Sequence, residues 1–236
     1  MDYITREETL VVSGLDIVVR EQDGNAEDIL FQAGKDIHKA LPRYWASLTV
    51  SLGDNENVRK EHLVKLRSPD LDQIAMAIYR AGSPDDSITL TGACPGCRKP
   101  INVTQDMNAL DFMPIPDGKN GPDPTFELVT RRGNEIVWGY TTGEDEFAQF
   151  SQKGFDASRR VWKAIRSING KTDISLKDVL ALPIACHHDI RRHMQKKRCG
   201  YDTRIAFEHT CGYEGVANLL TDPSFLLPGI PSPTGG

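Results

Sequence analysis

Apolar and polar residues alternate near the N-terminus, and the same pattern returns in the second half of the chain. Residues 8–20 alternate around a Ser13-Gly14 turn, and residues 126–138 alternate around a turn at Arg132-Gly133. Alternation on both sides of a short turn is typical of paired strands. The pattern therefore predicts one β-hairpin in each half.

Helical periodicity follows the first hairpin. Apolar residues recur at helical spacing over residues 26–40, and Pro42 is expected to end this helix. Residues 45–52 fit a strand or a helix nearly equally. Ser68 is placed to cap a further helix, which Pro69 opens.

Two short strands then flank a cysteine knuckle. Residues 87–91 and 101–104 are predicted to be these strands, with Cys94 and Cys97 in the turn between them. The knuckle closes the first half of the chain.

The second half repeats this order of elements. A helix is expected from Gly143 to about Ile168, and residues 175–198 supply more helix, with a break at Pro183. A second strand pair is predicted between Ile205 and Val216. Matching residues lie 116 to 119 positions apart, which is what a degenerate tandem duplication leaves.

These patterns predict an α+β fold made by tandem duplication of one module. Each module consists of a β-hairpin, helices and a zinc-ribbon-like pair of strands. The first module is expected to span residues 1–116, a Pro- and Gly-rich linker residues 117–124, the second, degenerate copy residues 125–228, and an extended tail residues 229–236. We expect the apolar residues Phe225-Leu226-Leu227 near this tail to bind a partner rather than to enter a core.

Composition limits the class of protein. The chain has 236 residues, 39% of them hydrophobic, and it contains no apolar run of membrane-spanning length and no signal-peptide pattern at its start. We therefore expect no membrane insertion and a cytoplasmic site of synthesis. The formal net charge of −5 argues against nucleic acid as the partner.

The cysteines carry the most specific chemical signal. Five cysteines, two of them in Cys94-Pro95-Gly96-Cys97, favour a metal or free thiols in a reducing compartment. We expect one structural zinc ion bound by Cys94, Cys97 and Cys211, with Cys199, His209 or Glu214 as the fourth ligand. The alternative is a metal-free remnant of an ancestral ribbon.

Motifs of catalysis are missing from the sequence. It contains no GxxxxGK[ST], GxGxxG, GxSxG or HExxH pattern. The acidic pairs, such as Asp85-Asp86, stand where turns and helix starts are predicted. We therefore expect a protein that is not an enzyme.

A family resemblance rests on three segments. They are Val18-Val19-Arg20 with the acidic helix start at residues 26–30, the Pro-Asp-Leu-Asp-x-Ile helix at residues 69–74, and the knuckle at residues 91–97 leading to Phe112-Met113-Pro114. In these the chain resembles the T4-type baseplate protein family of contractile-tailed bacteriophages, which contains baseplate hub and hub-assembly proteins.

The resemblance implies a structural component of the virion, located in the tail baseplate and assembled in the host cytoplasm. Its partners would be other baseplate, hub or tail proteins, to which it docks during assembly. One alternative is a transient assembly chaperone for the hub. Another is a zinc-ribbon protein that binds nucleic acid or has a regulatory role, which would require basic residues to gather on the ribbon.

Overall fold

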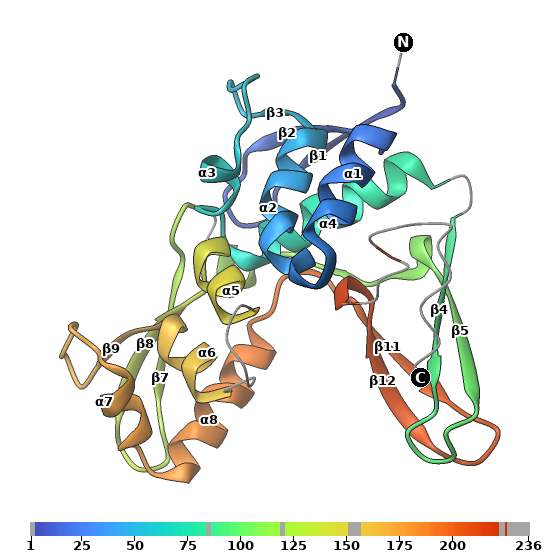
Figure 1. Cartoon of the computed structure of the whole chain (residues 1–236). Helices are drawn as coiled ribbons and strands as arrows, with labels where there is room; N and C mark the ends of the chain where they lie inside the picture. The colour runs from blue at the N-terminus through green and yellow to red at the C-terminus, as the bar shows by residue number, and fades with distance from the viewer. Residues whose placement is uncertain (1–2, 84–85, 119–120, 151–156, 222–224, 226–236) are drawn as a thin grey trace.

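The computed structural model describes residues 3–83, 86–118, 121–150, 157–221 and 225. Over these ranges the chain is an α+β protein with antiparallel strand pairing. A central lobe carries two arms (Figure 1). We call residues 125–199 the helical arm, and the two hairpins at residues 87–106 and 204–218 the ribbon arm.

The central lobe packs helices against a three-stranded sheet of order β1-β2-β3. Its strands are β1 (Thr5–Thr9), β2 (Asp16–Arg20) and β3 (Thr49–Leu52). Its helices are α1 (Gly24–Ala33), the 3-10 helix η1 (Gly34–Asp36), α2 (Ile37–Leu48), α3 (Lys60–Leu63) and α4 (Ser68–Gly82). Helix α4 lies under the sheet and buries almost every residue from Pro69 to Ala81.

The helical arm repeats this order of elements. Its sheet has the order β7-β8-β9, with β7 (Thr125–Val129), β8 (Glu135–Gly139) and β9 (Ile165–Ile168). Its helices are α5 (Gly143–Phe150), α6 (Ala157–Ala164), α7 (Leu176–Leu180) and α8 (Ile184–Lys196). Both sheets shift register at equivalent places, after Val18 in β2 and after Val137 in β8. That the repeat arose by duplication stays a prediction.

The ribbon arm combines one hairpin from each half. The first hairpin is β4 (Ser87–Ala93) with β5 (Pro100–Asp106), and the second is β11 (Arg204–Glu208) with β12 (Glu214–Asn218). Near its root, β6 (Phe112–Met113) pairs with β10 (Gly200–Tyr201). Short 3-10 helices follow at η2 (Met107–Ala109), η3 (Pro116–Gly118) and η4 (Leu219–Thr221).

Three local predictions were wrong. The first helix ends at Ala33, before Gly34 with φ +54°, and Pro42 lies inside α2. The helix from Gly143 does not reach Ile168, because residues 165–168 form β9 at the edge of the sheet. Ser68 does not cap α4, whose cap residue is Arg67.

Packing crosses the boundary between the halves. The core of the central lobe includes Ile205 and Leu219 from the second half, and the core of the helical arm includes Val12 from the first. The predicted linker is held too, since the Pro122 carbonyl accepts a hydrogen bond from Arg67 at 2.9 Å. The division into two modules at residues 117–124 therefore stays a prediction from the sequence. The predicted tail at residues 229–236 lies outside the described residues.

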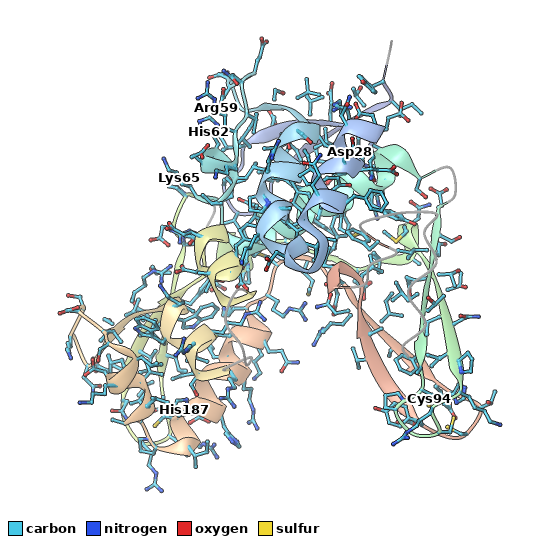
Figure 2. All side chains as sticks on the ribbon, in the orientation of Figure 1. Asp28, Arg59, His62, Lys65, Cys94 and His187 are labelled. Atoms are coloured by element: carbon cyan, nitrogen blue, oxygen red, sulfur yellow. The ribbon has the colours of Figure 1, made fainter. Side chains whose placement is uncertain are left out.

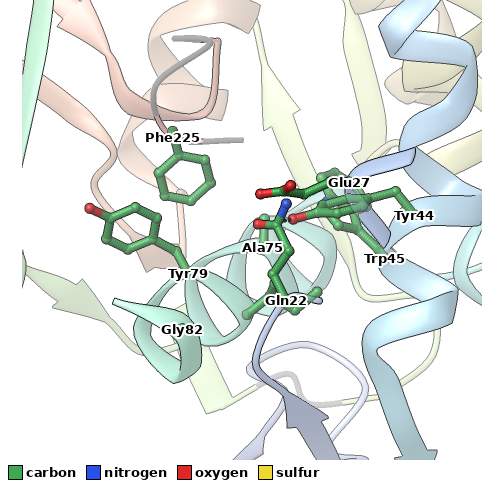
Figure 3. A pocket seen from close by; sticks show the side chains of 9 residues that line it. Gln22, Glu27, Tyr44, Trp45, Ala75, Tyr79, Gly82 and Phe225 are labelled. Atoms are coloured by element: carbon green, nitrogen blue, oxygen red, sulfur yellow. Dashed lines mark hydrogen bonds between the residues drawn. The ribbon is translucent and has the colours of Figure 1, made fainter. Parts of the chain in front are cut away.

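Phe225 corrects the interpretation of the C-terminal apolar residues. Its ring stacks on Tyr79 with centroids 5.0 Å apart, and the residue is 4% exposed. It helps to line a cavity of about 190 Å³, together with Gln22, Tyr44 and other residues (Figure 3). Phe225 thus belongs to the core of the central lobe, while Leu226 and Leu227 lie outside the described residues.

Asp70 ties the β1-β2 turn to α4. Its carboxylate is fully buried and accepts the N–H groups of Val12, at 2.7 Å, and Ser13, at 3.0 Å. Burial raises the pKa of Asp70, and these hydrogen bonds oppose that shift. The contact holds Val12 in position to enter the core of the helical arm.

We expect Asp70→Ala to lower the free energy of unfolding by about 2–4 kcal/mol, because it leaves buried N–H groups without an acceptor. Urea denaturation measures this change. Asp54→Ala, at an exposed loop carboxylate, is the matched control and should change stability by less than about 0.5 kcal/mol. Equal effects of the two substitutions would contradict this role for Asp70.

Candidate metal centre

The two hairpins of the ribbon arm are anchored at their roots. Ile88 and Leu90 of the first hairpin and Ile205 of the second are buried in the core of the central lobe. Their turns lie side by side at the far end of the arm, where Figure 2 labels Cys94. Segments more than 100 positions apart in sequence therefore meet at this tip.

The two turns are closed in the same way. Cys94 donates its N–H to the Lys99 carbonyl across the first turn, at 2.8 Å, and His209 donates its N–H to the Tyr213 carbonyl across the second, at 2.9 Å. Cys94 and His209 thus occupy equivalent places in their hairpins. The second turn is one residue shorter, with Gly212 at φ +80°.

Glycine at position 96 allows a close contact between the tips. A Cβ atom added at Gly96 would lie 3.0 Å from Tyr213 Cβ and 3.2 Å from Tyr213 Cγ. A side chain at position 96 would require Tyr213 to shift by a few tenths of an ångström. The small residue thus lets the second turn approach the first.

Four potential ligands meet at the tip: Cys94, Cys97, His209 and Cys211, whose ligand atoms all lie within 4.8 Å of one another. The Sγ atoms of Cys94 and Cys211 are 3.7 Å apart, and Cys97 Sγ is 3.5 Å from His209 Nδ1. Around a tetrahedral zinc ion two sulfurs are about 3.8 Å apart, and a sulfur and a nitrogen about 3.5 Å. The four residues are therefore close enough to bind a metal ion, and the spacing is compatible with zinc.

One distance is shorter than a coordination tetrahedron requires. His209 Nδ1 lies 3.1 Å from Cys211 Sγ, so the imidazole ring must move outward by about 0.4 Å to share an ion with that thiolate. His209 stands on a short turn at the tip of the arm, where such a movement disturbs no core contact.

The first turn favours the thiolate of Cys94. Burial raises the pKa of this thiol, but the N–H groups of Cys97 and Gly96 and the Cys211 thiol lower it, and the net pKa is below the usual value. For Cys211 the Tyr213 N–H lowers the pKa, whereas burial and the neighbouring thiols raise it above the usual value. Backbone N–H groups aimed at sulfur stabilise the charged form that binds a metal.

Cys199 is not part of this cluster, which corrects the expected ligand set. It is 7% exposed and packs in the core of the helical arm. Burial raises the pKa of its thiol to about 11, so the neutral form prevails there. His209, one of the alternatives for the fourth ligand, lies with the three cysteines instead.

The sequence held a signal for His209 that the repeat alignment obscured. Matching Cys94 to Cys211 at an offset of 117 left the second turn without a partner cysteine. Hairpin geometry instead matches Cys94 to His209 and leaves Cys211 beside Cys97. Glu214, the remaining alternative, begins β12 opposite Glu208 and is not a member of the cluster.

Comparisons with protein-family models, curated proteins and solved structures find no match to this chain. In the described ranges, no helix has both the length and the apolar character to cross a bilayer.

His209→Ala should lower zinc affinity by at least about 100-fold, since even partners beyond the ligands contribute about 10–100-fold. Cys199→Ala should leave the affinity unchanged, because that thiol lies in another core. Competition against a chromophoric chelator measures both values. Loss of affinity in the Cys199 variant, with its melting curve preserved, would restore Cys199 as the ligand.

Proposed function

We propose that one structural Zn²⁺ ion, bound by Cys94, Cys97, His209 and Cys211, clamps the two hairpins of the ribbon arm. Three soft thiolates and an imidazole suit zinc and exclude magnesium or calcium as the preferred ion. Four protein ligands complete the tetrahedron and leave no position for a substrate. The closed donor set supports a structural rather than a catalytic role.

The ion would join the two halves of the chain at a point distant from their cores. Cys94 and Cys211 are 117 positions apart, so the ion closes a long loop. The free energy of binding then contributes to folding, because the unfolded chain has no preformed site. A clamp of this kind gives the ribbon arm a fixed surface for a partner.

We further propose that the protein is a non-enzymatic structural component of a bacteriophage tail baseplate, in the hub region. It would act by docking to other baseplate, hub or tail proteins during assembly in the host cytoplasm and would stay in the virion. The family resemblance described above supports the assignment, and the closed metal site supports the non-enzymatic role.

Two alternatives differ in what they require. A transient chaperone of hub assembly would share the fold but leave before the particle is complete. A zinc ribbon that binds nucleic acid would need a basic surface on the hairpins. Residues 87–106 and 204–218 carry three cationic and three anionic side chains, which disfavours that alternative.

Metal removal should destabilise the protein. An ion present at about 1,000 times its Kd contributes about 4 kcal/mol, which corresponds to about 8–16 °C in Tm for a chain of this size. We therefore expect a strong zinc chelator to lower Tm by that amount, and elemental analysis to find one zinc per chain.

The control is the double variant Cys94→Ser with Cys97→Ser. It should melt near the temperature of the chelated wild type and should not respond further to chelator. A wild-type protein that contains no zinc and melts at the same temperature with and without chelator would refute the clamp.

Co-purification with a tagged chain tests the baseplate assignment. Recovery with tail or baseplate proteins in intact particles is the expected result. Recovery with free hub intermediates alone would favour the chaperone, and recovery with nucleic acid at physiological salt would refute the assignment.

A further inference from the structure

The two halves of the chain meet at a joint made by backbone hydrogen bonds. The N–H groups of Gly143 and Glu144, which open α5, donate to the Leu66 and Val64 carbonyls at 3.0 and 2.9 Å. Ser68 returns one hydrogen bond, from its N–H to the Thr141 carbonyl at 2.9 Å. We call residues 64–68 the acceptor side of the joint and residues 141–144 its donor side.

The helical arm contains a second copy of the acceptor side. In the central lobe Leu66 donates its N–H to the Leu63 carbonyl; 116 positions later, Leu182 donates its N–H to the Val179 carbonyl. Leu63 and Val179 are both fully buried. The start of the next helix also matches, because Arg67 accepts the N–H groups of Asp70 and Leu71 as Pro183 accepts those of Cys186 and His187.

This second acceptor side is uncovered. Leu180 is 55% exposed and Ile184 is 68% exposed, although their counterparts, Val64 and Ser68, contact the donor side. Among the described residues, the N–H of Ile184 makes no hydrogen bond, whereas the Ser68 N–H is bonded to Thr141. We call residues 180–184 the open acceptor face.

His187 supports this interpretation. It is the counterpart of Leu71, which packs against Gly143 in the joint, and it is 5% exposed at the far end of the helical arm (Figure 2). Its Nδ1 atom is buried and has no hydrogen-bond partner among the described residues. A buried polar atom without a partner is destabilising, so a group from outside that reaches it would be stabilising.

The central lobe carries a matching second donor side, at the start of α1. Gly24 and Asn25 stand where Gly143 and Glu144 stand in the helical arm, 119 positions later. A Cβ atom added at Gly143 would lie 2.6 Å from Leu71 Cδ1, whereas one added at Gly24 meets nothing within 4 Å. Gly24 and Asn25 are exposed, and residues 22–25 form an open donor face.

The two open faces belong to parts of opposite charge. The helical arm, residues 125–199, contains 14 Lys and Arg against 9 Asp and Glu, although the whole chain carries −5. The remainder of the chain is therefore strongly acidic. Opposite charge favours contact between the arm of one molecule and the central lobe of another.

We propose that a second copy of this chain docks head to tail, its open donor face on the open acceptor face of the first. The contact repeats the internal joint: Gly24 and Asn25 donate to the carbonyls of Leu182 and Leu180, and Ile184 donates to the Gln22 carbonyl. Because different surfaces meet, the contact is heterologous and builds a ring or a filament. This inference goes beyond the baseplate proposal and does not depend on the metal ion.

Two substitutions test the two faces one at a time. Ile184→Glu places a carboxylate in the open acceptor face at a position that is already exposed, so the monomer should fold. Gly24→Pro removes the donor N–H, and proline is compatible with the first turn of α1 because Asp23 before it is extended, at φ −125° and ψ 172°. Thermal melting of each variant confirms folding.

Sedimentation of the full chain over a range of concentrations is the test. Wild type should form oligomers that weaken as salt rises, and each variant alone should sediment as a single chain. An equal mixture of the two variants should form dimers, because each retains the face that the other has lost. Val216→Glu, at a residue 65% exposed on β12, is the control and should associate like wild type.

Three outcomes would overturn the proposal. Wild type could keep the mass of one chain at every concentration. An oligomer could ignore Gly24→Pro, which would indicate a symmetric contact or another surface. The mixed variants could stay monomeric although each is folded, which would exclude a head-to-tail contact. None of these results bears on zinc content or on co-purification with baseplate proteins.

Discussion

The position of the helical arm depends on a close backbone joint in which residue 143 is a glycine. Gly143 brings the start of α5 against Val64 and Leu71 so closely that a Cβ atom added there would lie 3.0 Å from Val64 Cα. The first N–H groups of a helix have no partner within the helix, and here carbonyls from the other half accept them. One interaction thus satisfies a helix end and fixes the direction in which the second half leaves the first.

The joint also explains why the ribbon arm can form from two distant hairpins. Since the halves are held together, β10 returns to pair with β6, and the second hairpin then packs its root into the core of the central lobe. The tips meet at Cys94, Cys97, His209 and Cys211. A metal ion there would strengthen an arrangement that hydrophobic packing already specifies at the roots, because the two links act at opposite ends of the same hairpins.

Local patterns succeeded where one element decides its own structure. The hairpin that begins each half, the location of the α4 start next to Pro69 and the break at Pro183 follow from residue type and spacing. They failed where a neighbour decides. Residues 165–168 were predicted to be helical, but they form β9 because β8 offers a free edge for pairing. Pro42 is tolerated inside α2 because Leu41, Tyr44 and Trp45 bury the inner face of that helix. Cys199 was assigned to the metal on its place in the sequence, and burial in a different core separated it from the tip.

By itself, the sequence determined the α+β class, the repeated order of elements and three cysteines of the candidate metal centre. Periodicity and turn residues are local properties of the sequence, so they predict an element without reference to the segments that pack around it. The tertiary structure alone decided that His209 completes the cluster, that Val12 and Phe225 enter cores distant in sequence, and that one acceptor side is covered while its counterpart is open. Each of these depends on a contact between segments more than 70 positions apart, and no local pattern specifies which distant segment will fill a given space.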